Sequence, residues 1–368
     1  MEEAYERKTM KKRVGILTFH DTNNFGSWLQ TYGLYKKLLE LGIKVEIINY
    51  QCDEMIKREK LTWKKTIQLL QQKDWYVYQF LWKWIKKQTW FFIYSKMYLK
   101  LSRKKYYRYN IKESNFAYDT FLIGSDLVWD TRITNGDFTY MLDFADKDKK
   151  KLSYAASIGY EKIPESQKEN YKKYLRRFSC ITVREKSARD LLQNLTSYSI
   201  SIVSDPTLLL SKQEWLSFID KKNLYGHYVL VYFIDDKKEI LRLAKQYAHK
   251  HKCKVLIISD NKLSNECCIS PMNVSEFLSL IYYAEKVFTA SYHGILFSVY
   301  FEKQLAFVHR NPMDRMRFIA ERFEIEYSEI HHESFDVERK INYGKVTPIV
   351  KTFRQESTQK LKAMIGEI

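Results

Sequence analysis

The stretch KRVGILTFHDTNNFGSWLQTYGLYKKLLELGIKVEII, residues 12–48, contains the pattern of a strand, a helix and a second strand. Residues 12–19 form a short apolar run, and polar turn residues follow them. From Gly26 to Leu41 the leucines recur at close to helical spacing, and Gly42 is a typical residue for ending a helix. A second apolar run covers residues 45–48. The stretch therefore predicts a βαβ unit with parallel strands.

The same rhythm continues along the chain on both sides of Asp205-Pro206, where the residue before proline disfavours helix. Strands are predicted at 120–123, 152–158, 180–183 and 200–203, and a second series at 228–234, 254–258, 286–288 and 304–308. Helices are predicted at 239–249, 274–283, 295–300 and 314–323. We expect an α/β protein with two Rossmann-like, doubly wound domains facing a cleft, the GT-B-like plan, with ligands at the carboxyl ends of strands. The expected ranges are 11–208 with an insertion at 57–112, 209–345, and a C-terminal helix at 346–368.

The basic character of the chain is concentrated in that insertion. The 368 residues carry a net charge of +18, and residues 57–112 hold 16 Lys and Arg against 2 acidic residues. The same segment holds 15 aromatic residues. Within residues 75–101 one helical face is predicted to carry Tyr78, Trp82, Ile85, Thr89 and Phe92, and much of the remainder carries Gln79, Lys83, Lys86 and Lys87. Such a helix either lies on an anionic membrane surface or packs its apolar face on the first domain or another subunit.

Several classes of protein are disfavoured by composition. The five cysteines are odd in number and include no CxxC, which argues against a disulfide framework or a zinc knuckle. No run of 18 apolar residues is present, and residues 1–12 contain no apolar signal region. We expect a reduced, cytoplasmic protein, and we expect it to need no metal because no ligand spacing is evident.

Two candidate sites fall in the first domain. Asn24 and Gly26 precede a predicted helix, where free backbone N–H groups favour an anion or a hydroxyl. Gly124, Ser125 and Asp126 follow an apolar strand, where the aspartate could accept a hydrogen bond from a sugar hydroxyl. The alternative at both places is an ordinary helix cap, a role that Asn, Ser and Asp fill well.

Two further candidates are a histidine and a set of arginines. His293 is expected in a loop between strand 286–288 and helix 295–300, and a near-neutral imidazole suits acid–base chemistry. Its alternative role is to cap that helix. Arg184 follows a strand and Arg315 stands at a helix start, and arginine binds carboxylate and phosphate bidentately. The alternatives are solvated surface charges or, for Arg184, pairing with a neighbouring carboxylate.

These sites, in this order, resemble the polysaccharide pyruvyl transferase family. The matching stretches are VGILTFHDTNNFGSWLQTYGLYKKL (14–38), YDTFLIGSDLVW (118–129), KLSYAASIG (151–159), ITVREKSA (181–188), SDPTLLL (204–210), the run from Glu276 through SYHGILFSVYF, and DRMRFIAERFEI with Arg315. The resemblance covers roughly residues 12–330. The family usually has Gln where Leu127 stands and a small residue where Trp28 stands.

The resemblance implies transfer of pyruvate from phosphoenolpyruvate to a sugar of a polysaccharide or its precursor, usually as a ketal, in the synthesis of cell-surface glycans. It implies an acceptor side in the first domain and a donor side in the second. The acceptor would be a sugar or a lipid-linked saccharide, which is consistent with peripheral contact with the inner face of the membrane. Phosphoenolpyruvate is a co-substrate, and no other cofactor is implied. The carried-over roles are proton donor for His293, donor binding for Arg184, Ser291, Gly294 and Arg315, and acceptor binding for Asn24, Gly26, Gln30, Ser125 and Asp126.

Two other functions share part of this evidence. A GT-B glycosyltransferase that uses a nucleotide-sugar would have the same architecture and an anion site in its second domain. A nucleic-acid-binding protein would explain the basic, aromatic segment. However, the charge is confined to an insertion in an α/β scaffold, and no recognised nucleic-acid motif is present, so we expect no nucleic-acid partner.

Overall fold

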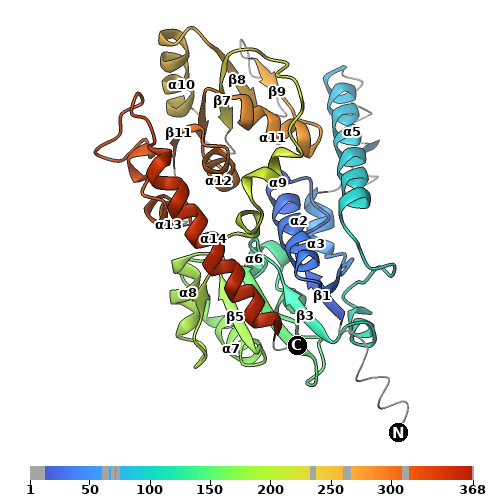
Figure 1. Cartoon of the computed structure of the whole chain (residues 1–368). Helices are drawn as coiled ribbons and strands as arrows, with labels where there is room; N and C mark the ends of the chain where they lie inside the picture. The colour runs from blue at the N-terminus through green and yellow to red at the C-terminus, as the bar shows by residue number, and fades with distance from the viewer. Residues whose placement is uncertain are drawn as a thin grey trace. The chain divides into compact units, whose positions relative to one another are not determined.

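The computed structural model describes residues 13–59, 66–67, 71, 75–232, 238–259, 267–308 and 315–366. The chain divides into two compact units (Figure 1). Unit 1 comprises Met1–Phe80, Phe92–Leu209 and Arg354–Ile368, and unit 2 comprises Leu81–Phe91 and Leu210–Phe353. Each unit is built around its own parallel sheet, so the predicted α/β class is confirmed.

The sheet of unit 1 has six parallel strands in the order β2-β1-β3-β4-β5-β6. The strands are β1 (Arg13–Leu17), β2 (Lys44–Ile47), β3 (Thr120–Ile123), β4 (Lys150–Ala156), β5 (Cys180–Val183) and β6 (Ser201–Ile202). Their side chains are largely buried, as in parallel sheets covered on both faces. The predicted first βαβ unit is therefore present, with β2 and β3 on opposite sides of β1.

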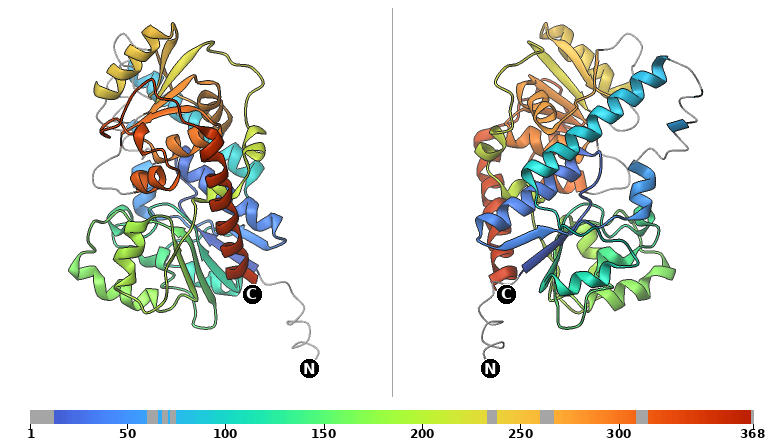
Figure 2. Two further views of the ribbon diagram at one scale, coloured as in Figure 1. Left: turned by 60° about the vertical axis from the view of Figure 1, so that its left-hand side comes forward. Right: turned by 90° about the vertical axis from the view of Figure 1, so that its right-hand side faces the viewer.

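The connections of unit 1 are mainly helical (Figure 2). The helices are α2 (Phe25–Glu40), α3 (Asp53–Glu59), α6 (Thr131–Thr134), α7 (Glu165–Leu175) and α8 (Lys186–Gln193), with 3-10 turns at Ile111–Phe116, Phe138–Met141 and Pro206–Leu209. Helix α2 ends where the sequence indicates, because Gly42 takes a left-handed conformation directly after the C-cap residue Leu41. Gly33, inside α2, has no room for a side chain, since a Cβ would lie 2.5 Å from the carbonyl oxygen of Pro206.

The sheet of unit 2 has five parallel strands in the order β11-β10-β7-β8-β9. The strands are β7 (Tyr228–Tyr232), β8 (Lys254–Ile258), β9 (Cys268–Ile269), β10 (Lys286–Thr289) and β11 (Gln304–Phe307). The helices are α9 (Lys212–Leu216), α10 (Lys238–Lys250), α11 (Val274–Tyr283), α12 (Tyr292–Tyr300) and α13 (Arg315–Arg322), with a 3-10 turn at Glu326–Ser328. The strand order corresponds to the dinucleotide-binding type of doubly wound sheet.

Two long helices belong partly to each unit. Helix α5 spans Trp75–Tyr98 and lies in the predicted insertion, and helix α14 spans Tyr343–Gly366. Residues 60–65, 68–70 and 72–74 of the insertion are outside the described residues. In the part of the chain that is described, no helix is long and apolar enough to cross a membrane.

One predicted boundary is wrong in a way that matters for the site. The helix predicted to begin at Ile295 begins at Tyr292, so His293 lies in the first turn of α12 rather than in a loop. The cause is Ser291, whose hydroxyl oxygen accepts a hydrogen bond from the backbone N–H of Gly294 at 3.3 Å. This N-cap starts the helix three residues before the first apolar residue of the periodic pattern.

Candidate functional site

In each sheet there is one position at which the connections leave in opposite directions. In unit 1 this switch point lies between β1 and β3, because β2 is on one side of β1 and β3 is on the other. In unit 2 it lies between β7 and β10. Ligands of open parallel sheets bind beside the carboxyl ends of strands at such a point. The residues that follow β1, β3 and β10 are therefore candidates for a ligand-binding site.

The turn after β1 leads directly into α2. Asn24 is the N-cap of this helix, and its side-chain oxygen accepts from the backbone N–H groups of Gly26 at 2.8 Å and Ser27 at 3.3 Å. The capping alternative is therefore present for Asn24. Ser27, in the first turn, has its hydroxyl available for a second contact, and sequence reasoning did not select this residue.

The turn after β3 is held close to β1. At Gly124 a Cβ would lie 2.9 Å from the Cβ of Thr18, so only glycine fits without a shift of the chain. The hydroxyl of Thr18 donates to the carbonyl oxygen of Ser125 at 3.0 Å. Asp126 then has a φ of 84°, a left-handed conformation that aspartate tolerates better than most residues. Neither Ser125 nor Asp126 caps a helix here, since Asp130 is the N-cap of α6.

The carboxylate of Asp126 joins the two turns. One oxygen accepts from the hydroxyl of Ser27 at 2.5 Å, and the other accepts from the backbone N–H of Leu127 at 2.9 Å. Asp126 is partly exposed, whereas Ser125 is fully buried. Among the predicted acceptor-binding residues, Asp126 thus offers a carboxylate that is both positioned by its neighbours and open to solvent.

Gln30 completes this cluster from the next turn of α2. Its amide nitrogen donates to the hydroxyl of Thr18 at 3.0 Å and to the carbonyl oxygen of Ser27 at 2.9 Å. Its amide oxygen has no hydrogen-bond partner among the described residues, although the side chain is fully buried. Buried polar atoms are nearly always hydrogen-bonded in native proteins. The fixed amide orientation makes this oxygen an acceptor for a small donor group.

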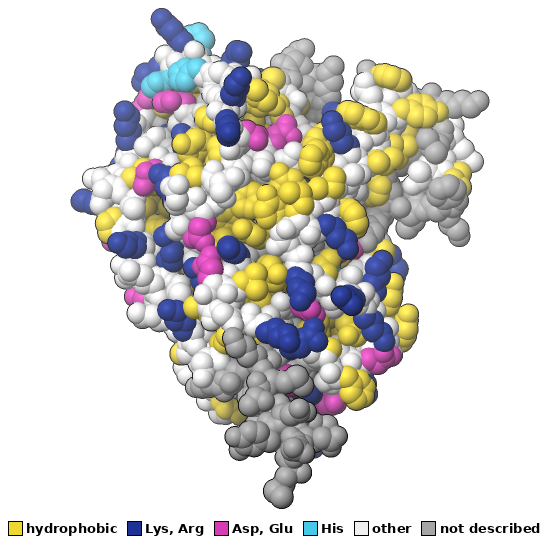
Figure 3. Space-filling model, turned by 45° about the vertical axis from the view of Figure 1, so that its right-hand side comes forward, with side chains coloured by type: hydrophobic (Ala, Val, Ile, Leu, Met, Phe, Trp, Pro, Cys, Tyr) yellow, Lys and Arg dark blue, Asp and Glu magenta, His cyan; other side chains and the backbone are white. Residues whose placement is uncertain are grey.

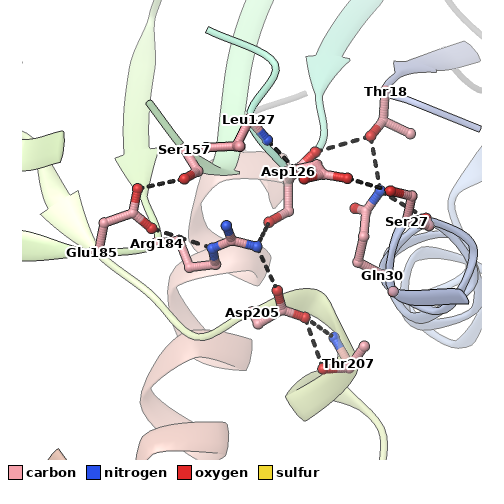
Figure 4. A network of polar contacts seen from close by, with 12 residues as sticks. Thr18, Ser27, Gln30, Asp126, Leu127, Ser157, Arg184, Glu185, Asp205 and Thr207 are labelled. Atoms are coloured by element: carbon pink, nitrogen blue, oxygen red, sulfur yellow. Dashed lines mark hydrogen bonds and ion pairs between the residues drawn. The ribbon is translucent and has the colours of Figure 1, made fainter. Parts of the chain in front are cut away.

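Arg184 lies in unit 1, beside the residues predicted to bind the acceptor (Figure 4). Its guanidinium lies between two carboxylates, with Nε 3.2 Å from Glu185 and Nη1 3.0 Å from Asp205. Nη1 is also 3.5 Å from the hydroxyl of Ser125. The side chain is 1% exposed. The predicted pairing of Arg184 with a neighbouring carboxylate is present, and a second carboxylate, Asp205, was not foreseen.

Both carboxylates have further partners. Glu185 accepts from the hydroxyl of Ser157 at 2.5 Å, and Asp205 accepts from the backbone N–H and the hydroxyl of Thr207 at 2.9 and 2.7 Å. Ser157 in turn donates its backbone N–H to the carbonyl oxygen of Asp126 at 3.0 Å. The network thus runs from α2 through the turn after β3 to the ends of β4 and β5, as Figure 4 shows.

A small pocket opens beside the same sheet edge, in the turns after β1 and β2. It is lined by residues that include His20, Tyr50, Cys52 and Tyr140. Tyr50 donates to Asp137 at 2.5 Å, and burial together with this carboxylate raises the pKa of Tyr50 strongly. Burial likewise raises the pKa of Cys52 to about 11, so its thiol stays protonated and is a poor nucleophile near neutral pH. Apart from His20, which lies in the predicted loop, sequence reasoning did not select these residues.

The residues of unit 2 that were predicted to bind the donor lie near one another after β10. Gly294 is required by packing, because a Cβ would lie 2.5 Å from the hydroxyl oxygen of Thr289. His293 is partly exposed and its ring is 5.4 Å from that of the buried Tyr292. Arg315, the first residue of α13, has its guanidinium carbon 5.7 Å from the ring centroid of Tyr292. Ser291, His293, Gly294 and Arg315 therefore surround one helix start.

Not all of the expected site is described. The residues that follow β7, 233–237, and those that precede α13, 309–314, are outside the described residues. The cleft expected between the domains also stays a prediction. In the described part of the chain, no group of three or more His, Cys, Asp or Glu side chains is placed to hold a metal ion. The expectation that the protein needs no metal stays a prediction as well.

Comparisons with known proteins agree with this architecture. A model of the family described as "Polysaccharide pyruvyl transferase" matches residues 24–310. No protein in the curated collection of characterised proteins matches the chain. Similar solved structures include UDP-GlcNAc 2-epimerase from Methanocaldococcus jannaschii, with a TM-score of 0.56, 12% identity, and coverage of 98% of this chain and 100% of that chain. The UDP-GlcNAc 2-epimerase from Neisseria meningitidis bound to UDP-GlcNAc has a TM-score of 0.52, 12% identity, and coverage of 96% and 93%. At this identity the likeness concerns the fold, which is GT-B-like with two Rossmann-like domains.

Proposed function

The chain belongs to the polysaccharide pyruvyl transferase family, and from this premise we propose that it transfers pyruvate from phosphoenolpyruvate to a sugar. The product would be a ketal across two sugar hydroxyls, made during the synthesis of a cell-surface glycan. The observation that carries the proposal is the position of the two polar clusters, each at the topological switch point of its own sheet. In this proposal unit 1 binds the acceptor and unit 2 binds the donor.

The cluster of unit 2 suits an anionic donor. Phosphoenolpyruvate carries a carboxylate and a phosphate, and the guanidinium of Arg315 can bind either bidentately. The first turn of α12 adds the positive end of the helix dipole, which favours an anion. His293 stands in that first turn and is partly exposed, so its imidazole can reach a ligand bound there.

The reaction requires two proton movements. A proton added to C3 of phosphoenolpyruvate turns the methylene into a methyl group and makes C2 electrophilic. A sugar hydroxyl attacks C2, the bond between C2 and the phosphate oxygen breaks, and the second hydroxyl closes the ketal. One hydroxyl proton is balanced by the proton gained at C3, and the other leaves with phosphate. We assign His293 to donate the proton either to C3 or to the leaving phosphate, a role worth about 10²–10⁴-fold in rate.

The cluster of unit 1 suits a polyol acceptor. Asp126 offers a partly exposed carboxylate that is held in position by Ser27 and Leu127. A carboxylate so placed can accept hydrogen bonds from sugar hydroxyls and orient them. The acceptor would be a free sugar or a lipid-linked saccharide. We also propose a cytoplasmic location with peripheral contact with an anionic membrane, where a lipid-linked acceptor would be found.

The decisive assay supplies phosphoenolpyruvate together with glycan precursors from the host. Phosphate release accompanied by a pyruvate-sized mass increase on a saccharide is the expected result. His293→Gln should lower phosphate release about 10²–10⁴-fold with unchanged circular dichroism. His249→Gln, at an exposed histidine near the end of α10, is the matched control and should keep full activity. Retention of most activity by His293→Gln would remove this residue from the mechanism.

The second candidate function is transfer from a nucleotide-sugar. It is favoured by the GT-B-like fold, which the similar structures share. A thermal-shift comparison separates the two, because a ligand that binds only the folded state raises its melting temperature with concentration. The proposal expects a shift with phosphoenolpyruvate and none with UDP- or GDP-sugars. The reverse result would favour the glycosyltransferase.

A further inference from the structure

Helix α5 exposes the face on which its large apolar residues recur. Trp82, Ile85 and Phe92 are 59%, 57% and 63% exposed, and Trp75 at the first turn is 69% exposed. With Tyr78, which is also exposed, these five residues define the α5 apolar face. They recur at intervals of three, four or seven residues, so they share one side of the helix. Soluble proteins rarely expose a contiguous apolar patch of this kind without a partner.

The opposite side of α5 is packed. Phe91 is buried, and near the C-terminal end Ser95 accepts a hydrogen bond from the indole nitrogen of Trp28 at 3.2 Å. The ring of Trp28 also contacts those of Tyr94 and Tyr98, at centroid distances of 5.8 and 6.0 Å. This packing fixes the rotation of the helix, so the apolar face is presented outward in the folded protein.

The charges beside the apolar face are all of one sign. Helix α5 contains Lys83, Lys86, Lys87 and Lys96 and no acidic residue. Lys86 places its ammonium 4.8 Å from the ring centroid of Trp82, and Lys96 places its own 5.6 Å from that of Phe92. Each of these two ammonium groups thus lies over an aromatic ring of the α5 apolar face, in a cation–π contact. Figure 3 shows hydrophobic and basic side chains intermixed on the side of the molecule that carries α5.

We infer that the α5 apolar face docks in the headgroup region of a bilayer that contains anionic lipid. An in-plane helix with Trp and Phe on one side and lysines at the border has the composition that this environment selects. The lysines would contact lipid phosphates while the aromatic residues enter the boundary with the acyl chains. A second copy of the chain is a poorer occupant, because a symmetric α5–α5 contact would bring two sets of lysines together without acidic partners.

This inference deepens the proposed function, because it gives the enzyme a surface at which a lipid-linked acceptor would be reached. The surface itself depends only on α5, and not on the chemistry at His293. Membrane binding and pyruvyl transfer can therefore fail independently, and they are measured separately.

The test is flotation of the full chain with two kinds of vesicle, neutral phosphatidylcholine alone and phosphatidylcholine mixed with phosphatidylglycerol. We expect binding to the mixed vesicles only, and we expect it to weaken as salt rises through the physiological range. The double variant Trp82→Gln/Phe92→Gln should lower the partition coefficient at least about tenfold, because each substitution removes the free energy gained when an aromatic side chain leaves water. The triple variant Lys83→Gln/Lys86→Gln/Lys87→Gln should lower it by about fivefold for each lysine that contacts the surface.

Matched controls exist elsewhere on the chain. Phe116→Gln removes an aromatic side chain that is 94% exposed and lies outside α5. Lys221→Gln/Lys222→Gln/Lys238→Gln removes three exposed lysines from unit 2. Both controls should bind vesicles as the unaltered protein does. Phosphate release with a soluble acceptor should be unchanged in the Trp82→Gln/Phe92→Gln variant.

Any of the following outcomes would overturn the inference. The first is that the protein stays in the soluble fraction with mixed vesicles at low salt. The second is equal binding to both vesicle types or full binding by the α5 variants. The third is a dimer in solution that the Trp82→Gln/Phe92→Gln variant abolishes, which would make the face a contact between copies. The last is a gel shift with RNA that needs Lys83, Lys86 and Lys87, in the absence of vesicle binding.

Discussion

Ser27 donates its hydroxyl hydrogen to the carboxylate of Asp126 and thereby joins the first turn of α2 to the turn after β3. The two residues are 99 positions apart in the chain, and they meet because β1 and β3 are neighbours in the sheet. Parallel strands bring the residues beyond their carboxyl ends to one edge. The contact therefore fixes the orientation of the partly exposed carboxylate that we assign to the acceptor sugar.

Asp126→Asn tests that assignment. Asparagine tolerates the left-handed conformation of this position, so the backbone is kept while the negative charge is lost. We expect kcat/KM for the acceptor to fall about 10–100-fold, the range for a lost hydrogen bond to a charged group. The melting-temperature shift caused by phosphoenolpyruvate should be unchanged. Ser27→Ala should have a smaller effect in the same direction, and Ser217→Ala, at the exposed C-cap of α9, should have none.

If Asp126→Asn lowers the affinity for phosphoenolpyruvate and leaves the acceptor dependence unchanged, the acceptor assignment is wrong. The turn after β3 would then belong to the donor site.

Arg184 offers a sharper choice between two roles. Its removal leaves Glu185 and Asp205 buried without the cation between them, and breaking a buried ion pair in this way costs about 3–5 kcal/mol. We therefore expect Arg184→Met to lower the free energy of unfolding by that amount in urea denaturation. Arg189→Gln removes an exposed pair with Asp190 and should change stability by less than about 1 kcal/mol.

The same variant tests the predicted role of Arg184 in donor binding. A variant that keeps its stability and loses the response to phosphoenolpyruvate would show that Arg184 binds the donor. Arg315→Lys provides the comparison, because it should raise the Michaelis constant for phosphoenolpyruvate through loss of the bidentate fork.

Most of the fold could be predicted from the sequence, because both sheets are made of short apolar runs separated by segments with helical periodicity. Strands 120–123, 180–183 and 254–258 begin and end at the predicted residues. The partners of the site residues were harder to predict. Nothing local to Arg184 indicates Asp205, which is 21 residues away and becomes its partner only when the end of β5 meets the chain after β6. Ser27 was missed for the same reason, since its role depends on Asp126.

For helix α5 the sequence predicted the helix but not which side of it is exposed. Its periodicity predicted a helix that places Tyr78, Trp82, Ile85, Thr89 and Phe92 on one face, and the chain is helical over these residues. Periodicity could not decide whether the face is buried, because an amphipathic helix usually turns its apolar side inward. The orientation depends on Trp28, the large residue at a position where the family usually has a small one, whose indole packs on the other side of α5.

Trp28→Ala should consequently release α5. The substitution removes the contacts with Tyr94 and Tyr98 and leaves a cavity, so the free energy of unfolding should fall by about 3–5 kcal/mol. Hydrogen exchange followed by mass spectrometry should show faster exchange in peptides that cover residues 92–98. Trp28→Phe keeps an aromatic ring and loses the hydrogen bond to Ser95, so a loss of only about 1 kcal/mol is expected. Unchanged exchange in the alanine variant would mean that other contacts hold the helix.

Lys286 gives a prediction about pH that is independent of the candidate site. Its side chain is buried, and burial lowers its pKa to about 8, although Glu338 and Asp336 act in the opposite direction. In the unfolded chain the ammonium keeps its proton up to about pH 10.4. Between these values the unfolded state binds one more proton, so the contribution of Lys286 to the free energy of unfolding rises with pH, by at most about 3 kcal/mol. Lys286→Met cannot titrate at this position. The stability difference between the unaltered protein and this variant should therefore shift in favour of the unaltered protein from pH 8 to 10.

Urea denaturation of both proteins at several pH values measures that difference. The tyrosines titrate in both proteins, so their contribution to stability cancels in the difference. Lys221→Met, at an exposed lysine, should give a difference that does not change with pH. A flat difference for Lys286→Met as well would mean that Lys286 stays charged in the folded protein, held by its hydrogen bond to the carbonyl oxygen of Val337 and by the rings of Tyr247 and Phe288.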